Sequence, residues 1–431
     1  MRSHNKMRGF SLVELMVAVV IGLIGTVVIF QVYAVSEGQK RSTVSGGDAQ
    51  QNGAIGLFTM ERELRNAGHG LTYLIARGAP IYGWNNVAGA ARPALVIRPL
   101  TIIAGATSDS IEVNYSTFEG LTSPVSVTTQ AIPPSPAGWD PASVAPTNAL
   151  QIAAVAGFNA GNKIVVCPPE VDPLGPPPGP ADNTCILAEI TGFGVDLARP
   201  NQVLLATPPT TFLSSNGGGL DTSKFNPAGG FSVLNATLAL DSKTLPALYS
   251  PGAQAADDAV VFNLGNTFVA RRYSVDVANS RLMVDDGGGA QEFSDGVIAI
   301  RAQYGLDTTA ILPDGVVDVW VNPRSVPGNA LADNTPDHPA FDITTSGKIA
   351  ESWRRVQAVR VAVVTRSGLF EKTEVETRSS IPLWVNPTGN PVPAPQYTVS
   401  AGDARHYRYK VFESIVPLRN MIWDVHRTTR K

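Results

Sequence analysis

The sequence is poor in charge. Charged residues make up 16% of the 431 positions, the formal net charge is −3, and no run of lysine and arginine exceeds two residues. A nucleic-acid-binding surface needs clustered basic residues, so the composition excludes nucleic acid as a partner. The sequence contains no H-E-x-x-H, G-x-S-x-G, Walker A or G-x-G-x-x-G pattern, and its five histidines stand alone. We therefore expect a protein without enzymatic activity, bound metal or cofactor.

Cysteine is nearly absent as well. The only two are Cys167 and Cys185, and they enclose a segment rich in proline. A metal site would need further cysteine or histidine ligands nearby in sequence, and none lies close. In an oxidising compartment, a bond between the two thiols would close a poorly ordered loop and stabilise the fold by ~3 kcal/mol in the chain-entropy model. We predict a disulfide.

Apolar residues, glycine and proline are abundant. The chain has 44% apolar residues, 40 glycines and 33 prolines, a composition typical of a β-rich and loop-rich exported protein with a buried core. Short β-type runs recur between Gly, Pro, Asn and Asp clusters, without a solenoid repeat, so we expect one globular head over 69–431. Insertions are expected near 131–148 and 168–184. The expected strands are Ala94–Ile103, Ser110–Tyr115, Val125–Thr129, Lys163–Cys167, Val203–Ala206, Ala259–Leu264, Phe268–Val277, Val297–Tyr304, Val317–Val321, Val356–Thr365, Glu371–Thr377 and Tyr407–Val416.

The most informative segment lies at the N-terminus. A basic leader, residues 1–9, ends in Gly9, and no charged residue occurs between Glu14 and Glu37. This apolar run is long enough to cross a hydrocarbon core of ~30 Å as a helix. A secretory signal instead places a shorter apolar core ahead of its cleavage site and is discarded. Here the expected cut, after Gly9, precedes the apolar run, so the mature chain keeps it.

The same helix is expected to continue beyond the membrane. No proline interrupts residues 10–79, and an amphipathic pattern with Ile55, Leu57, Phe58 and Leu64 follows the apolar run. We predict a membrane-spanning half at 10–36 and an amphipathic half at 37–68 that packs on the head. The glycines of the Gly68-His69-Gly70 segment mark the end of the helix. The cations of the leader indicate a cytoplasmic N-terminus and an exported body.

The run Gly9-Phe10-Ser11-Leu12-Val13-Glu14 after a basic leader resembles the class III leader of type IV pilins and pseudopilins. The resemblance implies that a prepilin peptidase cuts after Gly9 and that Phe10 is then methylated. It also implies that Glu14 pairs with the N-terminal ammonium of a neighbouring subunit during filament assembly. Two other interpretations of this segment are a plain signal anchor and a conventional signal cut after Ala34.

Further segments resemble the PilW family of minor pilins. The resemblance implies an α+β, type IV pilin-like fold in which a long N-terminal helix packs on a large antiparallel β-rich head. From the residues themselves, the arginines that alternate with apolar residues in these segments predict half-buried strands with a solvated outer face. The segments that carry the resemblance are 61–70, 297–307, 353–361 and 411–420.

A place in the pilus follows from the same resemblance. Major pilins carry a proline where this chain has Gln31, so we expect a subunit other than the repeating shaft subunit. Tip pseudopilins lack the carboxylate found here as Glu14, so we expect a position just beneath the tip. The implied function is a minor pilin that primes assembly. A J-type minor pseudopilin of a type II secretion system, or a membrane-anchored periplasmic enzyme, are the alternatives.

The implied partners are other minor pilins, the major pilin, prepilin peptidase and a tip adhesin. The implied location is the inner membrane, crossed once, with a periplasmic head that later reaches the pilus near its tip. No nucleic acid is expected among the partners.

One acidic segment has some features of a calcium site. The spacing of Asp314, Gly315 and Asp318 is similar to that of acidic residues in calcium-binding loops. A working EF-type loop needs oxygen ligands at its first and third positions, where this chain has Ala310 and Leu312. We therefore expect a hairpin turn here.

Overall fold

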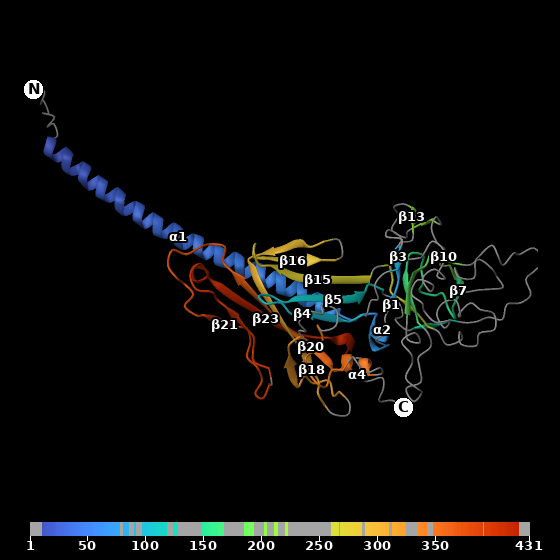
Figure 1. Ribbon diagram of the computed structural model, residues 1–431. Helices are drawn as coiled ribbons and strands as arrows, with labels where there is room; N and C mark the ends of the chain where they lie inside the picture. Colours follow the sequence, from blue (N-terminus) through green and yellow to red (C-terminus); the bar gives the residue numbers. More distant parts are fainter. Residues whose placement is uncertain are drawn as a thin grey trace, which may run out of the picture.

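A computed structural model gives the architecture of the chain: one long helix and a β-rich head that packs along its second half (Figure 1). The α+β prediction with a largely antiparallel head is confirmed. The residues that the structure describes are 11–77, 81–85, 90–91, 97–118, 124–127, 149–167, 185–193, 202–204, 211–213, 220–222, 260–266, 268–286, 289–309, 313–324, 334–342, 348–390 and 392–421.

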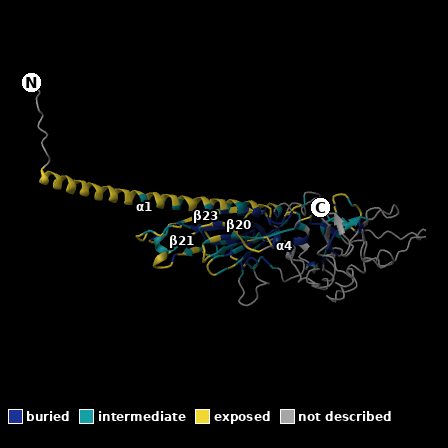
Figure 2. Cartoon of the chain, turned by 90° about the horizontal axis from the view of Figure 1, so that it is seen from above, coloured by how far each residue is buried: buried dark blue, intermediate teal, exposed yellow. Residues whose placement is uncertain are grey.

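Helix α1 (Leu12–Arg65) runs for 54 residues without a break. At 1.5 Å per residue it is about 80 Å long. Its first half projects from the head and is exposed, whereas the second half lies against the head (Figures 1 and 2). Basic residues occupy its last turn, where they complement the helix dipole. The helix ends at Arg65 with Asn66 as its C-cap, three residues before the expected end at residue 68, and Gly68 follows with φ of +75°.

The residues of α1 that the head buries differ from the expected ones. The buried positions are spaced by three or four residues, which places them on one face of the helix. Of the apolar residues expected to pack, Leu64 is buried and Leu57 is partly buried, but Ile55 and Phe58 are 47% and 67% exposed. Small residues line much of the packed face instead, so the helix backbone lies close to the sheet. The buried positions are Ala49, Gly53, Gly56, Met60, Glu63 and Leu64.

A four-stranded antiparallel sheet carries α1. Its strand order is β19-β18-β20-β23, and β20 pairs along its length with both neighbours. On one face, Val361 and Val363 join the main core with Met60, while on the other Ala362 and Val364 pack under Leu383 and Trp384. Because both faces are covered, every residue of β20 except the last is buried. The bounds are β18 (Val297–Leu306), β19 (Val319–Val321), β20 (Val356–Arg366) and β23 (Tyr409–Pro417).

A five-stranded sheet of order β17-β16-β15-β5-β4 forms the second layer. The buried hydroxyl of Tyr304, on β18, accepts the N–H of Ile102 at 2.7 Å and donates to the carbonyl of Asn334 at 2.8 Å. This single side chain therefore ties the edge strand β4 of one sheet to the centre of the other. The bounds are β4 (Leu100–Ile103), β5 (Ser110–Ser116), β15 (Phe268–Asp276), β16 (Arg281–Asp285) and β17 (Gln291–Asp295).

A third sheet, of order β1-β9-β8-β14-β6, lies at the end of the head far from the N-terminus (Figure 1). Part of it forms a second hydrophobic core around Ile164, Val166 and Ala188. Its bounds are β1 (Ile81–Tyr82), β6 (Val125–Ser126), β8 (Lys163–Cys167), β9 (Cys185–Glu189) and β14 (Val260–Asn263). The remaining elements are α2 (Thr72–Arg77), β2 (Trp84–Asn85), β3 (Ala90–Ala91), β7 (Ala149–Gln151), β10 (Gly192–Phe193), β11 (Gln202–Leu204), β12 (Thr211–Leu213), β13 (Leu220–Thr222), α4 (Lys348–Arg354), β21 (Ser380–Pro382), β22 (Gln396–Thr398) and the 3-10 turn η5 (Asp403–His406).

One expected strand is wrong. Residues 371–377 form an irregular loop, because Glu371 donates its N–H to the carbonyl of His406 while Val375 and Glu376 both donate to the carbonyl of Arg405. These bonds anchor the loop at two points and leave no regular ladder. Both expected insertions, near 131–148 and 168–184, lie outside the described residues.

Candidate assembly site on the N-terminal helix

Glu14 lies in the first turn of α1. The N-cap of the helix is Ser11, and the Glu14 carboxylate accepts the Ser11 N–H at 3.3 Å. A negative charge is favourable at this end of a helix, where unpaired N–H groups point outward. The carboxylate is exposed, so it remains open to a cation from another chain. Gly9 and Phe10, the expected processing residues, lie outside the described residues.

The helix beyond Glu14 is an apolar surface that the chain itself leaves uncovered. Within the described residues, α1 is the one helix long and apolar enough to cross a membrane, with a mean hydropathy of 2.7 in its best window and none of that window buried. An apolar surface of this size requires lipid or other apolar helices around it. The large exposed side chains are Leu12, Val13, Leu15, Met16, Val17, Val19, Val20, Ile21, Leu23, Ile24, Val27, Val28, Ile29, Phe30, Val32, Tyr33 and Val35.

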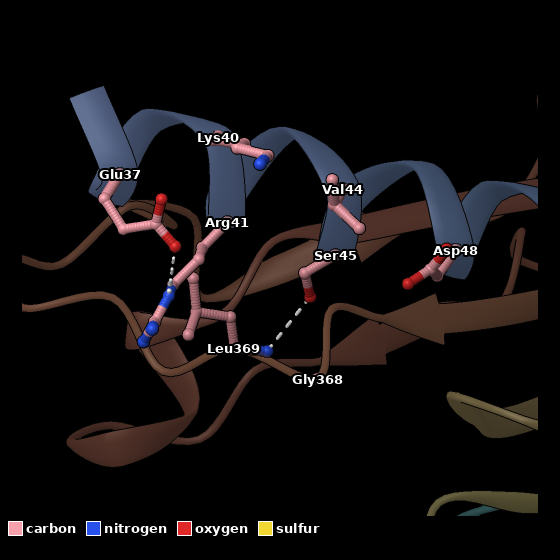
Figure 3. Close-up of a pocket in the computed structure, with 8 residues that line it drawn as sticks. All are labelled: Glu37, Lys40, Arg41, Val44, Ser45, Asp48, Gly368 and Leu369. Atoms are coloured by element: carbon pink, nitrogen blue, oxygen red, sulfur yellow. Dashed lines mark hydrogen bonds and ion pairs between the residues drawn. The ribbon is translucent and has the colours of Figure 1, made fainter.

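Near its midpoint the helix contacts the head through Ser42 and Ser45, and this contact is called the elbow below (Figure 3). The Ser45 hydroxyl accepts the Leu369 N–H at 3.1 Å, and the Ser42 hydroxyl donates to Glu371 at 2.7 Å. The bond from Ser42 and one from Arg408 hold the pKa of Glu371 below its ordinary value. A shallow groove of about 350 Å³ lies beside the elbow. It is lined by Glu37, Lys40, Arg41, Val44, Ser45, Asp48, Gly368 and Leu369.

At Gly53, α1 approaches the sheet closely. A Cβ atom at this position would lie 2.6 Å from Cγ2 of Thr365 and closer still to the Phe412 ring. Any larger residue would therefore force the side chains of Thr365 and Phe412, on strands β20 and β23, to move. A glycine within a helix costs up to ~1 kcal/mol relative to alanine, and at position 53 the structure shows the packing reason for it.

A buried polar cluster fixes the C-terminal end of α1. The Glu63 side chain is 5% exposed, accepts the Tyr115 hydroxyl at 2.6 Å and lies 3.2 Å from Arg271. Burial, followed by the bond to Glu63, raises the pKa of Tyr115 to about 12. Burial and the Glu63 charge also raise the pKa of Tyr273 in the same cluster. The helix is therefore joined to β5 and β15 by charge as well as by apolar contacts.

The predicted disulfide is present. Cys167 ends β8 and Cys185 begins β9, with their Cα atoms 4.4 Å apart and both side chains buried. The neighbouring pair in the antiparallel register is Val166 with Ile186, so the bond closes the open end of the ladder. It thereby fixes where the intervening segment leaves and re-enters the sheet.

The acidic segment after β18 forms a hairpin connection to β19, as expected. Asp307 accepts the N–H groups of Gly315 at 2.7 Å and Thr309 at 3.0 Å, and Asp318 accepts that of Thr308 at 2.7 Å. Burial alone would raise the pKa of Asp307, but these N–H bonds outweigh it and the pKa lies below the ordinary value. The described residues contain no group of three or more metal-binding side chains.

Two arginines of the 353–361 segment were expected on a solvated outer face, and this expectation is wrong. Arg355 and Arg360 are only 5% and 3% exposed. The Arg360 guanidinium lies between the rings of Trp320 and Trp384, at 4.7 and 4.6 Å from their centroids, and burial lowers its pKa to about 10. Alternation alone could not reveal this, because the covering residues lie elsewhere in the sequence.

Two family models match the chain. Residues 271–420 match the model described as Type IV Pilus-assembly protein W, and residues 4–30 match the Prokaryotic N-terminal methylation motif. The first match begins in β15 and contains the sheet that carries α1, while the second contains Glu14 and the start of the exposed apolar helix. No curated protein and no solved structure matches the chain. The matched families describe pilus assembly rather than catalysis.

Proposed function

Because the chain is a type IV pilus protein of the PilW family, we propose that it is a minor pilin that primes pilus assembly and lies near the pilus tip with other minor pilins. The observation that supports this best is the combination of an uncovered apolar helix with a single carboxylate at its start. Such a helix can be stored in a membrane and then transferred into a bundle of similar helices.

The proposed mechanism begins with processing. Prepilin peptidase removes residues 1–9, and Phe10 becomes the methylated N-terminal residue. In the helix bundle, Glu14 pairs with the N-terminal ammonium of a neighbouring subunit. A charge pair of this kind is strong where water is scarce, and leaving either charge unpaired there is costly, so it selects the register in which both are satisfied.

The head supports a heterotypic role rather than a place in the shaft. It is large and is fixed to the second half of α1 by the elbow and by the Glu63 cluster, so it follows the helix as a unit. Helix α1 also runs through Gln31 without a break. We propose that the head contacts other minor pilins, the major pilin and a tip adhesin.

Replacement of Glu14 tests the mechanism. Glu14→Ala should leave leader removal intact, as measured by mass spectrometry of the membrane protein, while it reduces surface piliation and the incorporation of this subunit. Glu37→Ala is the matched control, because Glu37 is a carboxylate of the same helix beyond the apolar run. Normal piliation with Glu14→Ala would contradict the mechanism.

A deletion strain separates the two machines that use such subunits. Loss of pili with unchanged protein secretion supports the proposed function. A secretion defect with normal pili would assign the chain to a type II secretion system instead.

A further inference from the structure

We propose that the loop at residues 367–374, called the foot below, rests in the headgroup layer of the membrane that holds α1. This proposal adds a lipid-binding surface on the head and rests on the proposed insertion of α1. The foot follows β20 and belongs to the side of the head, marked by β21 and β23, that lies nearest the exposed half of α1 (Figure 1).

The level of the foot along α1 follows from two hydrogen bonds. Ser42 and Ser45 hold the foot, whereas the exposed apolar run ends at Val35. The difference of seven to ten residues is about 10–15 Å of helix at 1.5 Å per residue. The headgroup layer adds roughly 5–8 Å beyond the hydrocarbon core, and membrane helices tilt by about 20° on average. A tilt toward the head therefore brings the foot to the lipid surface.

The foot presents an aromatic ring at this level. Phe370 is 47% exposed, and its ring stacks on His406 with centroids 4.5 Å apart and meets the edge of Tyr407 at 5.6 Å. Trp and Tyr rings are typical anchors at the boundary between water and lipid, and Phe is among the apolar side chains that membrane-surface segments insert there. Because Phe370 is supported by its neighbours, its exposed side costs little conformational entropy to insert.

The charges of the foot suit a phosphate-bearing surface. Lys372 of the foot is exposed, and the side chain of Arg408, which lies beside the foot and just before β23, is 56% exposed. The acids around them have protein partners, since Glu371 lies 3.0 Å from Arg408 and Glu374 lies 3.8 Å from Arg405. Cations near the membrane surface are attracted to anionic lipids, while their apolar stems stay in contact with the protein.

A fluorescence experiment tests the foot in the full-length chain. The chain is placed, one copy per disc, in nanodiscs of phosphatidylethanolamine and phosphatidylglycerol that include a lipid with a headgroup-level nitroxide quencher. Since the native cysteines are joined, a Thr373→Cys variant offers a single reactive thiol for a dye. Ala156→Cys, between β7 and β8 at the far end of the head, is the distant control. Ile24→Cys reports insertion of α1.

The proposal predicts several-fold stronger quenching of the dye at position 373 than at position 156. Adding Phe370→Ser should remove that difference, whereas Phe293→Ser, which removes a comparably exposed ring from β17, should leave it unchanged. Equal quenching at 373 and 156 with a quenched dye at 24, or no effect of Phe370→Ser, would overturn the foot alone. In discs prepared with two copies, a loss of quenching at position 373 would instead assign the surface to a neighbouring subunit. An unquenched dye at 24 would overturn membrane insertion and the foot together.

Discussion

Glu63 links the end of α1 to the head by charge. Its carboxylate is nearly inaccessible to solvent and satisfies both the Tyr115 hydroxyl and the Arg271 guanidinium. Removing the charge leaves Arg271 without its carboxylate, and partly buried charges that lose their partner are destabilising.

Glu63→Gln should therefore lower the free energy of unfolding of the head by about 1–3 kcal/mol. It should also lower the pKa of Tyr115 from about 12, because the Glu63 charge is one cause of the rise, although burial keeps the pKa above its ordinary value. Denaturant unfolding and ultraviolet titration of tyrosine measure the two effects. Glu61→Gln, on the same helix turn, should move neither quantity appreciably.

Gly53 acts through the absence of a side chain. Gly53→Ala should destabilise the docking of α1 by about 1–3 kcal/mol, because the added methyl overlaps Phe412 and Thr365. Gly47→Ala is the matched control, since nothing lies within 4 Å of a Cβ there and alanine favours helix. Thermal unfolding of both variants should show opposite shifts. A Gly53→Ala variant as stable as the parent would contradict the close approach.

At the scale of elements, we expect acid to weaken the elbow. The pKa of Glu371 is lowered in the folded state, from an ordinary value of 4.5, by its bonds to Ser42 and Arg408. Its contribution to stability is therefore fully present above that ordinary value and is lost as the pH falls through the lower folded pKa.

The unfolding free energy of the parent should consequently exceed that of Glu371→Gln near neutral pH, and the difference should shrink on acidification below about pH 4.5. Denaturant titrations across this range measure it. Glu374→Gln, in the same loop, is the control. A difference that stays constant down to the lowest pH would show that the Glu371 charge does not support the elbow.

The disulfide is the other element-scale constraint. Replacing both Cys167 and Cys185 by serine should lower the free energy of unfolding by about 2–4 kcal/mol, because the unfolded chain regains the entropy of the open loop. Reduction of the parent with dithiothreitol should reproduce the loss. If neither treatment changes the unfolding midpoint, the third sheet does not depend on the bond.

At the scale of the whole molecule, local sequence patterns were sufficient to predict those elements whose bounds are set by residues close together in the sequence. The end of α1 follows from two glycines with left-handed backbones, and the strand Lys163–Cys167 coincides with β8. The sequence did not indicate which side chains are covered by residues from remote parts of the chain. Phe58 is apolar yet exposed, and Arg360 is charged yet buried, because the surfaces that cover or expose them come from remote parts of the chain.

The hydrogen bond between Asn420 and the carbonyl of Ala67, at 3.0 Å, joins residues 353 positions apart. Synthesis of that much chain takes on the order of 20–70 s at 5–20 residues per second. Throughout this interval the second half of α1 has no sheet to dock on, because β20 and β23 are among the last strands to be made. The second half of α1 can therefore dock fully only after β23 has been made. A chain interrupted before β23 would carry an undocked helix and be open to proteases.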